Sequence, residues 1–156
     1  MRVFGRSPQG ATLGEVAGFV RDGGYFDEEP TFDPADALER MADAGWAALE
    51  IRYEPAPPPV VVWRSEEGGA VASEVDEALA RLAGAGEGSN AAALRARLRA
   101  ATVVFGLEVS ADTVSDEVWA MLDALAGYVA RRSDGVVYAP DDGFFDADLQ
   151  LLVRCR

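Results

Sequence analysis

Apolar residues recur at helical spacing in five stretches of the chain. Thr12 and Glu15 form a capping box in front of a first helix over 12–22. Asp33 followed by proline predicts the start of a second helix, which Gly45 is placed to close. The pattern thus predicts helices over 12–22, 34–44, 71–82, 89–98 and 115–134. In the last of these, Ser115 is the expected N-cap and Gly135 the expected left-handed residue after the helix.

Extended segments separate these helices. Leu49, Ile51 and Tyr53 alternate with polar residues, which is the pattern of a strand with one wet face. The segment 60–63 resumes extended character after a proline-rich connection, and 103–109 alternates in the same way. Strands are also expected at 2–4, and a closing hairpin of 136–138 with 149–153 around an acidic loop.

The order of these elements predicts an α+β fold in one domain, 1–156. Its first part matches the ferredoxin-like βαββαβ order, and an αββ unit is appended. Polar residues recur at alternating strand positions, which predicts a mainly antiparallel sheet covered by helices on one face only, a two-layer sandwich. These polar residues are Glu50, Arg52, Glu54, Arg64, Glu108, Gln150 and Arg154.

The apolar phase of each element also predicts the core. Trp119 follows the core residue Val118 directly and is expected at the rim of the apolar face of its helix. The predicted core is Leu38, Met41, Leu49, Ile51, Val62, Leu79, Leu82, Phe105, Leu107, Leu122, Leu125, Val129 and Leu151.

Composition excludes several kinds of chemistry. The chain has a formal net charge of −13, no histidine, and 14 basic residues that are all arginine. It therefore lacks a histidine base or metal ligand, a Schiff-base lysine and a phosphate-loop lysine. An acidic surface repels nucleic acid and anionic lipid, so we expect neither a nucleic-acid partner nor a membrane partner.

Cysteine usage and the N-terminal residues favour a cytoplasmic protein. Cys155 is the single cysteine, so an intramolecular disulfide is not possible. The first ten residues lack the apolar core of a signal peptide, and no stretch is long and apolar enough to be expected to span a membrane.

Two acidic segments resemble each other, 22–29 and 141–148. Both contain a glycine, an aromatic residue, phenylalanine and aspartates in the same order. One interpretation is a divalent-metal or carboxylate-dependent catalytic site, with Asp141, Asp142, Asp146 and Asp148 as candidate ligands. The other, which we favour because no EF-hand spacing is met, is a pair of glycine turns anchored by aromatic residues. We assign no catalytic residue and expect no cofactor.

Charge and the expected wet sheet face favour a protein-interaction function. We expect a non-enzymatic protein of the immunity or antitoxin type that binds a more basic protein. The preferred contact residues are Glu50, Arg52, Glu54 and Glu108, and the acidic loops at 27–29 and 141–148 are the second choice. The alternative is a divalent-metal enzyme or small-ligand module that uses the segments 22–29 and 141–148.

Overall fold

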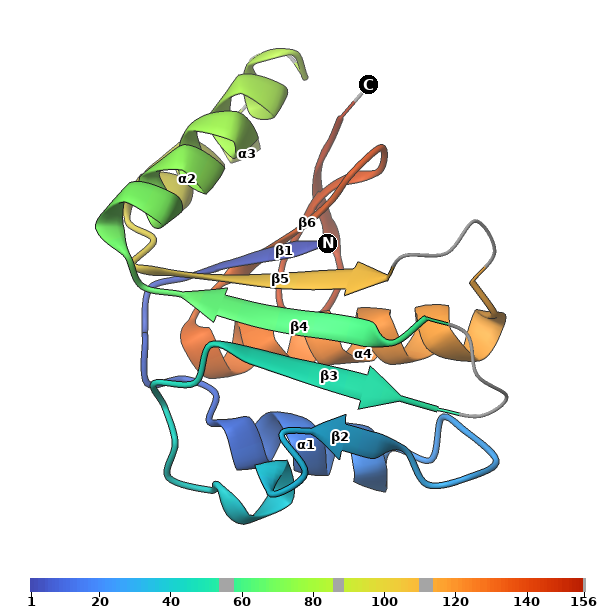
Figure 1. The fold of residues 1–156 in the computed structure, drawn as a ribbon. Coiled ribbons are helices and arrows are strands. Elements are labelled where there is room, and N and C mark those ends of the chain that lie inside the picture. Colours follow the sequence, from blue (N-terminus) through green and yellow to red (C-terminus); the bar gives the residue numbers. More distant parts are fainter. Residues whose placement is uncertain (54–57, 86–88, 110–113, 156) are drawn as a thin grey trace.

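The computed structural model describes residues 1–53, 58–85, 89–109 and 114–155 (Figure 1). It is a mixed α+β fold, as predicted. The helices are α1 (Leu13–Asp22), α2 (Gly68–Ala83), α3 (Ser89–Arg99) and α4 (Asp116–Ser133). The strands are β1 (Arg2–Gly5), β2 (Thr31–Asp33), β3 (Ala48–Arg52), β4 (Val60–Ser65), β5 (Val103–Val109), β6 (Val136–Ala139), β7 (Gly143–Phe145) and β8 (Leu151–Arg154).

All eight strands form one sheet in the order β2-β3-β4-β5-β1-β6-β7-β8. Every pairing between neighbouring strands is antiparallel, as expected. The predicted ferredoxin-like order is not confirmed. In a split βαβ unit, one strand lies between the first strand and the strand that follows the helix. The strand that the sequence predicts after the helix is β3, and here both β4 and β5 lie between β1 and β3, so that β1 runs antiparallel to β3.

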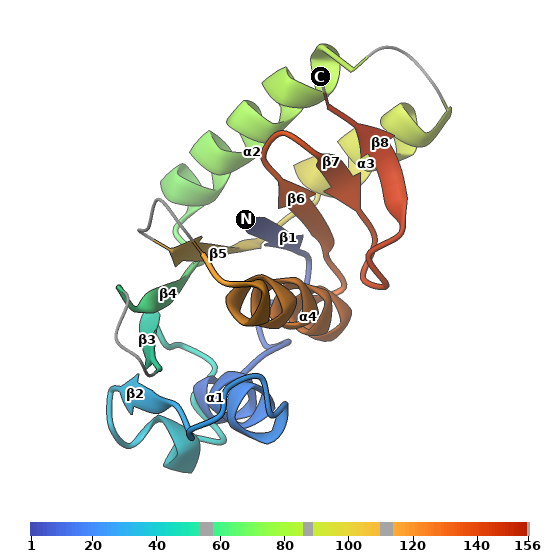
Figure 2. The ribbon, with the colours of Figure 1, turned by 90° about the vertical axis from the view of Figure 1, so that its right-hand side faces the viewer.

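Helices pack on both faces of the sheet, so the predicted two-layer arrangement is not confirmed either (Figure 2). α1 and α4 cover one face, where Val3, Phe105 and Val137 are buried. α2 and α3 cover part of the other face, where Phe4 and Val136 are buried. β1 and β6 carry apolar residues on both faces, which is typical of strands covered on both sides. The polar residues that predicted a wet face are exposed only towards the two edges of the sheet, Glu50, Arg52 and Glu108 near β3 and Gln150 and Arg154 at β8.

Arg64 was expected on the wet face but is only 8% exposed. It shares the strand phase of Val60 and Val62, both buried on the α1 and α4 side. Its guanidinium donates a hydrogen bond to the Pro8 carbonyl oxygen, with a distance of 2.7 Å. The side chains of Val61 and Trp63 therefore point to the opposite face of β4, where they are partly exposed.

The capping box at the start of α1 is confirmed, because the Glu15 amide donates to Thr12 Oγ1 and the Thr12 amide to Glu15 Oε2. The helix predicted over 34–44 is wrong, since only 37–39 form one turn of 3-10 helix. Nearby carbonyl groups instead accept hydrogen bonds from the first amides of α1, Arg40 from Gly14 and Asp43 from Leu13. These carbonyls stabilise the start of α1, whose first amides have no partner within the helix.

The C-terminal part also differs from its prediction. β6 pairs with β7 and β7 with β8, so the acidic loop expected inside one hairpin contains a strand of its own. Ser115 is the N-cap of α4 as expected, but the left-handed residue at the other end is Asp134, with φ of 52°, rather than Gly135. Asparagine and aspartate tolerate this conformation better than most residues.

Most of the predicted core is confirmed, with two errors. Met41 is 58% exposed because the helix that would bury it does not form, and Leu151 is 45% exposed on the edge strand β8. Leu38 and Leu79 are half-buried. The confirmed buried residues are Leu49, Ile51, Val62, Leu82, Phe105, Leu107, Leu122, Leu125 and Val129.

Candidate interaction surface

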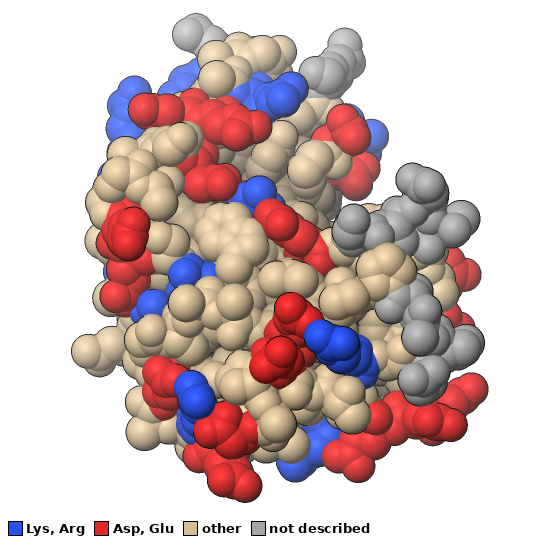
Figure 3. Space-filling view, in the orientation of Figure 1, with Lys and Arg blue, Asp and Glu red and all other residues tan. Residues whose placement is uncertain are grey.

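Part of the sheet face on the α2 side is not covered by helices. We define the open sheet face as Arg2, Glu50, Arg52, Val61, Trp63 and Glu108. β3, β4 and β5 place Glu50, Val61 and Glu108 side by side in one row. Trp63, Gly106 and Arg2 form the next row. Figure 3 shows this side of the molecule, with uncharged surface bordered by acidic and basic side chains.

The structure brings three of the four predicted contact residues together on this face. Glu50 and Arg52 form an ion pair of 2.7 Å, and their side chains are 37% and 59% exposed. Glu108 is 49% exposed. Glu54, the fourth predicted residue, lies outside the described residues. Exposed ion pairs contribute little to stability, so these charges can exchange partners at low cost.

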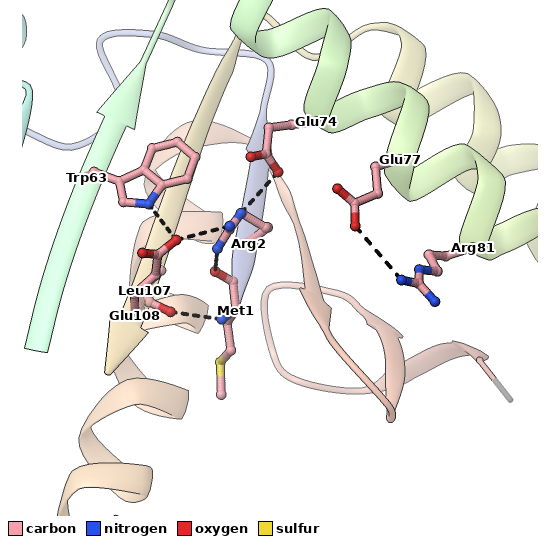
Figure 4. Close-up of polar contacts among 8 residues, drawn as sticks. All are labelled: Met1, Arg2, Trp63, Glu74, Glu77, Arg81, Leu107 and Glu108. Atoms are coloured by element: carbon pink, nitrogen blue, oxygen red, sulfur yellow. Dashed lines mark hydrogen bonds and ion pairs between the residues drawn. The ribbon is translucent and has the colours of Figure 1, made fainter. Parts of the chain in front are cut away.

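A polar network fixes Trp63 at the centre of the open sheet face (Figure 4). Its Nε1 donates to Glu108 Oε1 at 2.8 Å, and the same oxygen pairs with Arg2 at 3.0 Å. The Arg2 guanidinium lies 4.9 Å from the centre of the indole and also pairs with Glu74 at 3.0 Å. Trp63 is therefore a rigid, partly exposed aromatic side chain between charged neighbours. The sequence signal for an outward-facing Trp63 was its position along β4. It points to the same face as Val61 and to the opposite face from the buried residues of the strand.

The acidic segments 22–29 and 141–148 lie on opposite sides of α4 (Figure 2). Asp146 Oδ1 accepts hydrogen bonds from the Asp148 and Gln150 amides, both at 2.9 Å, so it shapes the turn between β7 and β8. Asp148 pairs with Arg131 at 3.2 Å. In the described part of the chain, no three His, Cys, Asp or Glu side chains are grouped to hold a metal ion.

A polar cavity of about 200 Å³ lies between α2, β1 and β6. Its charged lining residues are Arg2, Glu74, Glu77, Arg81 and Asp141, of which Glu77 and Arg81 form a 4.0 Å ion pair (Figure 4). Cys155 also lines it, and burial raises the pKa of this thiol. The thiol is consequently protonated at neutral pH.

A second hollow lies between α4 and the strands β6 and β7. We call it the α4 groove; its volume is about 420 Å³. Trp119 is 46% exposed at its rim, as its position next to buried Val118 predicts. The groove is lined by Met1, Trp119, Asp123, Val137, Ala139, Asp142, Phe145 and Leu149. The sequence did not predict this groove, because its walls come from segments far apart in the chain.

The Asp123 carboxyl in the α4 groove is under electrostatic strain. Partial desolvation, and then the charge of Asp142, raise its pKa above the ordinary value of 3.8. Ionised Asp123 thus costs the folded state free energy at neutral pH, because the unfolded chain ionises it more easily.

We expect Asp123→Asn to raise the melting temperature at neutral pH. A folded-state pKa above the unfolded one destabilises the fold above that pKa, so the gain should shrink as the pH falls through it towards 3.8. Thermal unfolding followed by circular dichroism from neutral to acidic pH measures this. Asp148→Asn is the control and should give no gain, since Asp148 pairs with Arg131. An Asp123→Asn gain that stays constant with pH would contradict this explanation.

No protein-family model, curated protein or solved structure matches this chain. None of the helices in the described ranges has the length and apolar character to cross a membrane. The function is therefore argued from the surfaces of the chain itself.

Proposed function

We propose that this chain is a non-enzymatic, acidic interaction protein of the immunity or antitoxin type, which binds a more basic protein through the open sheet face. The observation that carries the proposal is the uncovered part of the sheet over β3 and β4, beside a part that α2 and α3 cover. On it, Val61 lies between Glu50 and Glu108, and Trp63 lies in the next row. The net charge of −13 supports a cationic partner.

Preorganisation supports this surface as a binding site. Aromatic side chains in the centre of an interface often contribute most of the binding energy. Trp63 is already fixed by Glu108 and by the Arg2 guanidinium, so little conformational entropy is lost when a partner covers it. The surrounding carboxylates favour approach of a positively charged surface and disfavour an acidic one.

The metal-dependent alternative has less support. It requires the segments 22–29 and 141–148 to converge, and they lie on opposite sides of α4. Asp146 and Asp148 are engaged in the β7–β8 turn and with Arg131. Asp22 pairs with Arg21 at 2.8 Å. These carboxylates have hydrogen-bond or ion-pair partners within the chain, so a bound cation is not needed to explain their positions.

We expect affinity capture from lysate of the producing cells at low salt to recover a basic protein. With that purified partner, Glu50→Arg combined with Glu108→Gln should lower the association rate constant about tenfold at low salt, and less at high salt. Melting temperatures should change little, because Glu50 is an exposed strand position and a glutamine amide oxygen at position 108 can still accept the hydrogen bond from Trp63 Nε1. Stopped-flow measurements over a range of salt concentrations give the rates.

The matched control is Glu39→Arg combined with Asp76→Asn, which makes the same change in net charge at exposed positions outside the open sheet face. This control should slow association by no more than about twofold. Equal slowing in both double variants would show that only net charge matters. The proposal would be overturned by that outcome, by association rates that do not depend on salt, or by recovery of no protein partner.

A further inference from the structure

The α4 groove is a wedge that closes at one end and opens at the other. Trp119, Asp123, Gly127 and Arg131 repeat every four residues and therefore lie along one side of α4. At Gly127 the segment after β7 packs so closely that an added Cβ would lie 3.1 Å from the Ala147 carbonyl oxygen. Arg131 donates to the same oxygen at 2.8 Å and seals this end. Two turns earlier, at Trp119, the wedge is open.

Apolar side chains line the groove at both ends. Trp119 lies at the open end, and Leu149, which is 36% exposed, lies at the closed end, where its Cγ is 3.6 Å from a Cβ added at Gly127. Phe145 also lines the groove, and Leu151 is its neighbour on β8, with 45% exposure. Three of the four large apolar side chains that are clearly exposed in the described structure, Trp119, Leu149 and Leu151, thus lie at or beside this groove. Neighbouring exposed apolar side chains of this size mark binding surfaces.

The rim of the open end is negatively charged. Asp123 and Asp142 both line the groove, and the repulsion between them contributes to the raised pKa of Asp123. Within the described ranges neither carboxylate forms an ion pair. At the closed end, by contrast, Asp148 is paired with Arg131. A cation between Asp123 and Asp142 would remove their repulsion.

Apolar walls and a carboxylate rim together suit a cation on an apolar stem. The methylene groups of an arginine can lie along an apolar wall while its charge remains at the rim. Its planar guanidinium stacks on an indole ring and can donate to two carboxylates at once. A compact hydrated metal ion would use the carboxylates but not the apolar walls.

We propose that the α4 groove binds an arginine side chain from a basic segment of a protein partner, with its stem along Trp119 and its guanidinium between Asp123 and Asp142. The choice of a protein segment as occupant rests on the proposed function. A second copy of this chain is a poor occupant, because two molecules of charge −13 repel each other. The volume of about 420 Å³ holds one or two side chains rather than a folded element.

The three tryptophan indole groups allow this site to be tested separately from the open sheet face. The probe is the heptapeptide GSRLRSG with blocked termini, and the matched control peptide carries citrulline, a neutral analogue, in place of both arginines. Nitrogen-15 NMR spectra of the whole chain follow the indole N–H signals, assigned with Trp119→Phe and Trp63→Phe. We expect the Trp119 signal to shift in a saturable way with the arginine peptide only. The signal of buried Trp46 should not move.

Variants then test the named residues. Asp123→Asn and Asp142→Asn should each weaken peptide affinity about threefold to tenfold, and Trp119→Ala about fivefold. All three positions are exposed, so folding is retained. Asp148→Asn makes the same charge change outside the groove and should leave the affinity within twofold.

The outcomes distinguish this inference from the proposed function. The inference is overturned if the Trp119 signal stays fixed, if the citrulline peptide shifts it equally, or if Asp148→Asn weakens binding as much as the groove variants. It is also overturned if the signal shifts with protein concentration alone, since a second copy would then be the occupant. With the captured partner, movement of the Trp63 signal reports on the open sheet face independently. A shift of Trp119 without Trp63 would support the groove and contradict the proposed face.

Discussion

Replacing Phe105 by alanine is expected to lower the free energy of unfolding by about 3–5 kcal/mol. Phe105 is fully buried in the centre of the sheet, where β5 pairs with both β4 and β1. Its ring lies 6.0 Å from that of Trp46 and below the guanidinium of Arg64. Truncation leaves a cavity that these neighbours cannot fill without moving the strands, and unfolding in urea measures the loss.

Leu151→Ala is the informative control for Phe105→Ala. The alternation of apolar residues places Leu151 in the core, whereas the structure leaves it 45% exposed on β8. We therefore expect its truncation to cost less than about 1 kcal/mol. Losses of similar size for the two variants would contradict the assignment of β8 to the edge of the sheet.

The sequence predicted those elements whose signals are local and mutually consistent. α1 has both a capping box and an apolar stripe, and α4 has an N-cap with buried residues at helical spacing. β3 shows a clear strand phase, and β5, which is apolar on both faces over most of its length, is buried in the middle of the sheet. In such segments capping, periodicity and burial agree, so tertiary packing keeps the secondary structure that the local sequence favours.

Where the prediction failed, contacts distant in sequence decide the structure. The segment 34–44 has a helix-start signal, but Arg40 and Asp43 supply carbonyl groups to α1 instead. The strand order could not be predicted because local periodicity does not specify which strands pair. That order places β1 and β6 under α2 and α3 and leaves β3 open, so the wet face was predicted correctly only for part of the sheet.

The two candidate sites illustrate the same distinction. Glu50 and Arg52 could be placed on an exposed face from alternation within one strand. The α4 groove could not, because Asp123, Asp142 and Leu149 line one hollow only when β6, β7 and the segment that follows β7 pack against α4. An exposed tryptophan beside a predicted core position was the one local sign of it.

Gly106→Ala is expected to disrupt the open sheet face. An added Cβ would lie 2.1 Å from Cε2 of the Trp63 indole, so the ring must leave its place on the strand. The Trp63 bond to Glu108 and the stacking of Arg2 would both be lost. We expect a loss of about 1–3 kcal/mol in the free energy of unfolding, together with a shift of the Trp63 indole signal.

Gly18→Ala is the matched control, because no heavy atom lies within 4 Å of the added Cβ. In the middle of α1 it should stabilise the protein by about 0.5–1 kcal/mol. Combining Gly106→Ala with Trp63→Ala should cost less than the sum of the two single changes, since the alanine methyl group then occupies space that the indole has left. Additive losses would show that Gly106 is required by the strand backbone rather than by Trp63. A double variant that loses less than the sum of the single changes would instead identify Gly106 as the residue that lets Trp63 lie flat on the sheet, where a partner can cover it.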